Sequence, residues 1–86
     1  FETRDAARII QAQRDLVAAN PRDFQARIIL GNALAETGRL AEAVQILEAV
    51  ITERPGFLPT YLILANFYQA RRQLAKAIET FERALV

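Results

Sequence analysis

The chain repeats itself every 34 residues, and this repeat limits its possible folds more than any other feature. Segment 31–44, GNALAETGRLAEAV, has a counterpart at 65–78, ANFYQARRQLAKAI. Between residues 20–52 and 54–86 the identical pairs at this step are Pro21/Pro55, Ile29/Ile63, Leu30/Leu64, Asn32/Asn66, Leu40/Leu74, Ala41/Ala75, Ala43/Ala77 and Glu48/Glu82. A period of about 20 to 50 residues is typical of proteins that stack one small structural unit several times.

Apolar residues within each unit recur every three or four positions, which is the spacing of one helix face. The pattern runs through Leu40, Ala43, Val44, Leu47, Val50 and Ile51, and again through Leu74, Ala77, Ile78, Phe81, Ala84 and Leu85. We therefore expect one all-α domain with helices at about 3–20, 24–37, 40–53, 58–71 and 74–86. Residues 3–20 would be the second helix of a preceding unit, and 21–55 and 56–86 would be two full units.

Several residues predict where the helices begin and end. Asp23 suits the N-cap of the helix that follows it, and Pro59 suits a first helical turn. Gly38 lies where a first helix must end, at a left-handed position that glycine occupies at little cost. Its counterpart is Arg72, so the second of these turns is expected to be strained or to close differently.

A two-helix unit of this length, with small residues where the helices cross and a proline at its end, resembles the tetratricopeptide repeat. The residues that carry the resemblance are Leu30, Gly31, Leu34, Ala43, Leu47 and Pro55, then Tyr61, Leu64, Ala65, Tyr68, Ala77, Phe81 and Ala84. The resemblance implies a right-handed α-solenoid of antiparallel helix pairs. The related pentatricopeptide repeat, which reads RNA, has a different period and different hallmark residues.

Most of the repeated residues are interpreted as a packing pattern rather than as a chemical site. Small side chains at Gly31, Ala43, Ala65 and Ala77 would let two helices approach, since larger ones overpack the crossing. The layer around each crossing is predicted to contain Leu30, Leu47, Leu64 and Phe81.

The resemblance places any binding site on a concave groove lined by the first helix of each unit. Its positions correspond here to Gln25, Ile28, Ile29, Asn32, Glu36, Leu62, Ile63, Asn66 and Gln69. Asn32 and Asn66 would clamp a ligand backbone, because an amide both donates and accepts hydrogen bonds; alternatively, they cap or bridge helices. The isoleucines and Leu62 would favour an apolar peptide or partner helix, although Ile29 and Ile63 could instead pack inside the stack.

Composition argues against several other functions. The chain has no His and no Cys, and its net charge is +1. We therefore expect no enzyme activity, cofactor or metal site, and no nucleic-acid partner. No apolar run approaches the roughly 18 residues of a membrane span, so membrane insertion is not expected. The excess of arginine over lysine suggests a bacterial source.

Two local features concern charge and solvation. Arg71, Arg72 and Lys76 form a basic cluster that is expected to be solvated, with an acidic partner segment as the alternative. Glu79 and Arg83 are spaced to pair on one helix face.

The leading hypothesis is a scaffold that binds a peptide or helix of another protein in the groove. The alternatives are a spacer or self-assembly element of a larger repeat protein, or a domain appended to an enzyme. Because the chain opens on Phe1 and stops within the pattern, we expect it to be a piece of something longer. Ile78, Phe81 and Leu85 would lie on an uncapped face of the last helix, where self-association is possible.

Overall fold

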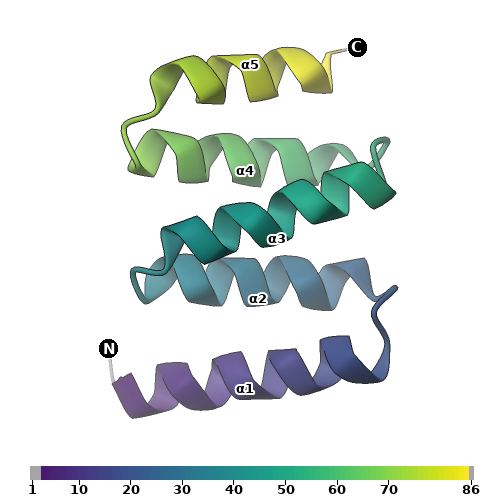
Figure 1. Cartoon of the computed structure of the whole chain (residues 1–86), viewed down its shortest axis with the longest axis vertical. Coiled ribbons are helices and arrows are strands. Elements are labelled where there is room, and N and C mark those ends of the chain that lie inside the picture. Colours follow the sequence, from purple (N-terminus) through teal and green to yellow (C-terminus); the bar gives the residue numbers. More distant parts are fainter. Residues whose placement is uncertain (1–2, 86) are drawn as a thin grey trace.

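The computed structural model describes residues 3–85, and these form helices joined by short turns (Figure 1). The helices are α1 (Thr3–Ala19), α2 (Phe24–Glu36), α3 (Leu40–Glu53), α4 (Leu58–Ala70) and α5 (Leu74–Ala84). They stack in chain order, and each runs antiparallel to the one before it (Figure 1). Described residues include no strand.

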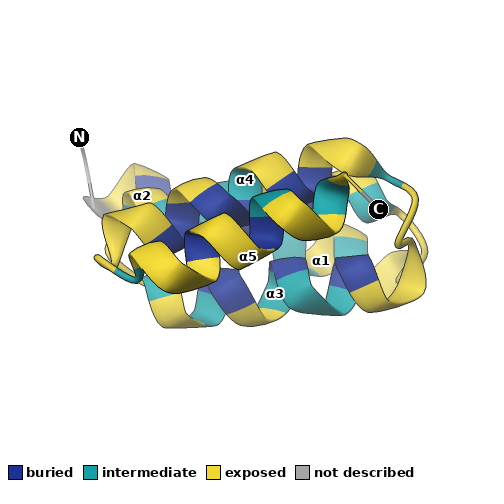
Figure 2. Ribbon diagram, turned by 90° about the horizontal axis from the view of Figure 1, so that it is seen from above, coloured by how far each residue is buried: buried dark blue, intermediate teal, exposed yellow. Residues whose placement is uncertain are grey.

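Helices α2 and α4 share one layer and α3 lies in the other, so the stack is two helices thick (Figure 2). The shortest dimension of the Cα trace is 14 Å, which suits two layers whose axes lie about 8–10 Å apart. Each unit is thus an antiparallel pair, α2 with α3 and α4 with α5, and α3 also packs against α4. Helix α1 packs against α2 in the same way.

Local residues set the helix ends. The Asp23 carboxylate accepts a hydrogen bond from the Ala26 amide at 3.0 Å, which caps the N-terminus of α2. Such a cap stabilises a helix by about 1 kcal/mol. Pro59 lies in the first turn of α4, where its missing N–H would have had no helical partner.

The turns that end α2 and α4 have the same geometry although their central residues differ. Gly38 has φ 85° and Arg72 has φ 59°, both in the left-handed region. The Arg39 amide donates to the Leu34 carbonyl and the Gln73 amide to the Tyr68 carbonyl, each at 2.8 Å. The second turn therefore closes as the first does, and Arg72 carries the strain of a side chain at a left-handed position.

The core lies between the helix layers and includes the crossings of α2 with α3 and of α4 with α5. Ala43, Leu47, Leu64 and Ala65 have no exposed surface. Gly31 shows how close the crossing is, because a Cβ atom added there would lie 2.5 Å from Leu47 Cδ2. Leu30 and Ala77 are also buried, and Phe81 is half-buried against the same core.

Candidate protein-binding surface

An exposed stripe runs along each of the two first helices. Gln25, Ile29 and Glu36 are exposed on α2 and Asn32 is half-buried between them. Leu58, Leu62, Asn66 and Gln69 are exposed on α4. Residues three and four apart lie on the same helix face, so each set forms one continuous strip. We call these two strips together the first-helix face; among its members only Glu36 is charged.

Two residues that the sequence placed in the groove have less surface than expected. Ile28 is only 8% exposed and belongs to the core, so the prediction that it lines an open groove is wrong. Ile63 is half-buried and packs against the core. Gln25, Ile29, Asn32, Glu36, Leu62, Asn66 and Gln69 keep exposed or partly exposed side chains.

Position in the stack explains these differences. Ile28 is buried, whereas its counterpart Leu62 is 52% exposed. Ile28 belongs to the first full unit, which is followed by a second; no described unit follows that of Leu62. The relation reverses for Ile63, which is half-buried, and its counterpart Ile29, which is 48% exposed. A first helix precedes the unit of Ile63, whereas only α1, a second-type helix, precedes that of Ile29.

The two asparagines of the first-helix face have no hydrogen-bond partner among the residues that the structure describes. Within residues 3–85, neither the Asn32 nor the Asn66 side chain makes a hydrogen bond to another residue. Neither amide therefore caps or bridges a helix in this structure. Each has two N–H groups and a carbonyl oxygen that remain available to another molecule.

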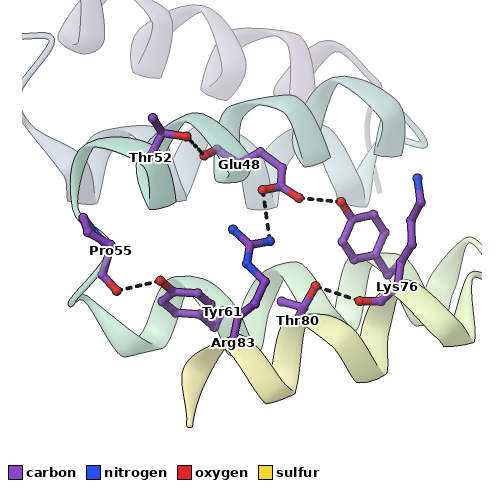
Figure 3. Close-up of polar contacts among 8 residues, drawn as sticks. Glu48, Thr52, Pro55, Tyr61, Lys76, Thr80 and Arg83 are labelled. Atoms are coloured by element: carbon purple, nitrogen blue, oxygen red, sulfur yellow. Dashed lines mark hydrogen bonds and ion pairs between the residues drawn. The ribbon is translucent and has the colours of Figure 1, made fainter. Parts of the chain in front are cut away.

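A polar cluster that the sequence did not predict joins the two full units (Figure 3). The Tyr68 hydroxyl donates to Glu48 Oε2 at 2.6 Å, and Arg83 Nη1 lies 3.4 Å from Glu48 Oε1. Arg83 therefore pairs with Glu48 on α3, not with Glu79 as its spacing suggested. Burial and the hydrogen bond to the Glu48 carboxylate raise the pKa of Tyr68 from 10.0 to about 12. The only sequence signal was the repeat of Glu48 at Glu82.

Two further ionic contacts connect neighbouring elements. Arg14 on α1 pairs with Glu42 on α3 at 2.7 Å. Arg27 pairs with Glu53 at 2.7 Å, and this hydrogen bond holds the pKa of the Glu53 carboxyl below its usual value. Both pairs are partly exposed, so they align the helices more than they stabilise them.

Candidate sites of other kinds are lacking in the part of the chain that the structure describes. No group of three or more His, Cys, Asp or Glu residues among residues 3–85 is placed to hold a metal ion. None of the described helices combines the length and apolar character needed to cross a bilayer.

Comparison with known proteins identifies the repeat. Tetratricopeptide repeat matches cover residues 34–85 and residues 3–56. The chain belongs to the tetratricopeptide repeat family. Its five described helices are therefore an α-solenoid of that type, with α2–α3 and α4–α5 as two complete repeats.

Solved structures of MamA have the same fold. The crystal structure of MamA matches with a TM-score of 0.80 and 26% identity, over 88% of this chain and 44% of that one. A structure of MamA AMB-1 matches with a TM-score of 0.77 and 27% identity, over 87% of this chain and 41% of that one. This tetratricopeptide chain thus spans under half of either.

Curated relatives share the repeat over a small part of their length. The chain is 26% identical to protein O-mannosyl-transferase TMTC1 of Homo sapiens over 88% of its own length and 9% of that protein. It is 30% identical to TMTC1 of Mus musculus over 80% of its length and 7% of that protein. The shared part is a repeat fold of a non-catalytic scaffold type, which supports a general role in protein interaction.

Proposed function

We propose that this tetratricopeptide chain binds an extended or helical segment of another protein along the first-helix face. The observation that carries the proposal is the pair of unpartnered amides, Asn32 and Asn66, at equivalent positions of consecutive units. Peptide backbones carry both donors and acceptors, so amides at this spacing could bind successive backbone groups without reading a particular side chain.

The composition of the face supports an uncharged partner segment. Ile29 and Leu62 are about half exposed, and each lies one helical turn from an asparagine of its own helix. Apolar side chains grouped with unpaired amides suit a ligand that buries an apolar side chain while its backbone makes hydrogen bonds. With Glu36 as its only charge, the face offers little to attract a strongly acidic or basic segment.

A selected peptide provides the test. Peptides chosen from a random phage-displayed library against the chain would be labelled and titrated, and binding would be followed by fluorescence anisotropy. We expect Asn32→Asp combined with Asn66→Asp to weaken binding at least about tenfold, because carboxylates cannot donate hydrogen bonds.

The matched control adds the same charge elsewhere. Ala12→Glu on α1 and Gln45→Glu on α3 are both at exposed positions outside the first-helix face, and this pair should bind as the unmodified chain does. Circular dichroism would verify that both variants are folded. Equal affinity of a folded asparagine double variant would contradict the proposal.

A role as a spacer or self-assembly element is the second candidate. It is favoured by two exposed apolar residues of α5, Leu74 and Ile78, and by exposed Leu85 at its C-cap. These residues lie apart from the asparagines, so the two functions can be tested separately.

A further inference from the structure

The turn between α4 and α5 contains an arginine in a backbone conformation that favours glycine. Arg72 has φ 59°, and its counterpart in the preceding unit is Gly38, which adopts the left-handed conformation without strain. The turn is closed by a backbone hydrogen bond from Gln73 to Tyr68, which does not use the Arg72 side chain. Strained residues cluster at functional sites, so the strain at Arg72 points to a function of its exposed side chain.

The two arginines of this turn have no partner within the described chain. Arg14, Arg27 and Arg83 form ion pairs with glutamates of other helices. Within residues 3–85, by contrast, neither Arg71 nor Arg72 makes an ion pair or a side-chain hydrogen bond. Both are exposed, so their guanidinium groups remain available to another molecule.

Two side chains extend this surface onto the start of α5. Leu74 is 61% exposed, although its counterpart Leu40 is half-buried and packs against the core. Lys76 is also exposed, and its ammonium group lies 5.7 Å from the centre of the Tyr68 ring. We call Arg71, Arg72, Leu74 and Lys76 the turn patch. It shares no residue with the first-helix face.

The preceding unit adds a basic residue at the same edge of the stack. The α2–α3 turn and the α4–α5 turn lie at this edge (Figure 1), and Arg39 is exposed in the first of them. Packed helix axes lie about 8–10 Å apart, so turns that are one repeat apart are separated by about 20 Å at most. An extended chain of about eight residues covers about 26 Å, so a single segment can contact both turns.

We infer that the turn patch binds an acidic segment of another protein that contains one large apolar residue. Carboxylates of the segment would pair with Arg71 and Arg72, because a guanidinium group can bind a carboxylate through two parallel hydrogen bonds. The apolar side chain would pack on Leu74, and a further carboxylate would pair with Arg39. Charge and apolar burial both contribute to the affinity in this arrangement.

A protein segment suits the turn patch better than a nucleic acid or an anionic membrane. Single-stranded nucleic acids stack their bases on aromatic side chains, but Phe67 and Tyr68, which precede the turn, are buried. A membrane surface would approach the whole edge, including exposed Asp5 and Glu36, and would repel their charges. A single segment is narrow enough to contact the basic residues alone.

The test uses a fluorescently labelled peptide of about ten residues, made of aspartate and glutamate with one central leucine. Anisotropy titrations of the whole chain at low salt should show saturable binding. Raising the salt concentration to about 0.5 M should weaken binding at least about tenfold, because exposed charges are screened. Leu74→Ala, or a glycine in place of the peptide's leucine, should weaken binding about threefold.

Arg72→Gly separates binding from folding, because it removes a charge and a backbone strain together. We expect this variant to bind the peptide at least about threefold more weakly, while its melting temperature rises by about 4 °C. Arg22→Gly is the matched control. Arg22 is also an exposed turn arginine whose repeat counterpart is a glycine, Gly56, but it lies at the opposite edge of the stack. This control should bind the peptide as the unmodified chain does.

Three outcomes would overturn the inference. The first is the absence of binding at low salt with up to about 1 mM peptide. The second is equal affinity of the Arg22→Gly and Arg72→Gly variants, which would mean that the turn patch does not hold the peptide. The third is tighter binding of phosphatidylserine vesicles or of a single-stranded oligonucleotide that Arg72→Gly weakens. This result would assign the turn patch to a membrane or to a nucleic acid.

Discussion

In the first full repeat Val44 and Ile51 are buried, whereas in the second their counterparts Ile78 and Leu85 face outward. The residues are equally apolar and lie at equivalent positions of the repeat, although Leu85 is the C-cap that follows α5 and Ile51 lies within α3. What differs is the neighbour, since α4 packs against α3 and Arg83 of α5 pairs with Glu48, whereas no described helix follows α5. Burial in a solenoid is therefore a property of the interface between units as much as of the residue itself.

The largest effect is expected for a substitution at the crossing of α2 and α3. This contact lies within one unit, so it does not depend on which unit comes next in the stack. Gly31→Leu should unfold the chain, because even a Cβ atom there would lie 2.5 Å from a Leu47 side chain that has no exposed surface. Overpacking typically costs about 1–3 kcal/mol, which is a large part of the marginal stability of so small a domain. A circular-dichroism melt of Gly31→Leu would show this as loss of the cooperative transition.

Gly56 offers a control for glycine replacement itself. A Cβ atom at Gly56 would meet no atom within 4 Å, so Gly56→Ala should melt close to the unmodified chain. An unchanged melt for Gly31→Leu would mean that α2 and α3 do not cross at this residue.

The next effect compares two equivalent positions directly. Ile51→Ala should destabilise the chain by about 2–4 kcal/mol, because it leaves a cavity under the second unit. Leu85→Ala should cost less than about 0.5 kcal/mol, because the side chain is exposed. Urea unfolding measures the loss of unfolding free energy for both variants. Similar losses at the two positions would contradict the claim that only Ile51 is covered by a neighbouring unit.

The polar link between the units predicts a pH dependence. Burial and the hydrogen bond to Glu48 both favour the neutral phenol of Tyr68, so the folded state holds its pKa at about 12, above the ordinary value of 10.0. This contribution to stability is complete below pH 10 and is lost as the pH rises toward 12.

Tyr68→Phe should therefore flatten the decline of the melting temperature above pH 10. It should also lower stability at pH 7 by about 1 kcal/mol, because Glu48 loses a donor. Thermal melts of both proteins between pH 7 and pH 11 measure the two effects. Parallel pH profiles would show that the titration of Tyr68 does not contribute to the decline in stability.

The smallest effect concerns the turns that differ between the units. Arg72→Gly should stabilise the chain by about 1 kcal/mol, because glycine adopts the left-handed conformation of this turn without strain. Gly38→Arg, the reverse change, should destabilise it by a similar amount. Urea unfolding of the two variants measures these changes. If both midpoints shifted in the same direction, the two turns would not be equivalent.

Features set by neighbours in sequence could be predicted, and those set by neighbours in space could not. The cap at Asp23 and the left-handed turn at Gly38 depend on a few adjacent residues, so the local sequence was sufficient to predict both. Ile28 is buried in a core that several helices build, and the partner of Arg83 lies on another helix. A period places equivalent residues at equivalent positions, but it does not say which of them a neighbour covers.

Binding along the first-helix face is the central claim, and NMR chemical-shift mapping with a phage-selected peptide tests it most directly. The account predicts that the largest amide and side-chain shifts fall on α2 and α4, with Asn32 and Asn66 among them and with α1 and α3 little changed. Shifts concentrated on the outer surfaces of α1 and α3, or on Leu74, Ile78 and Leu85 alone, would contradict it.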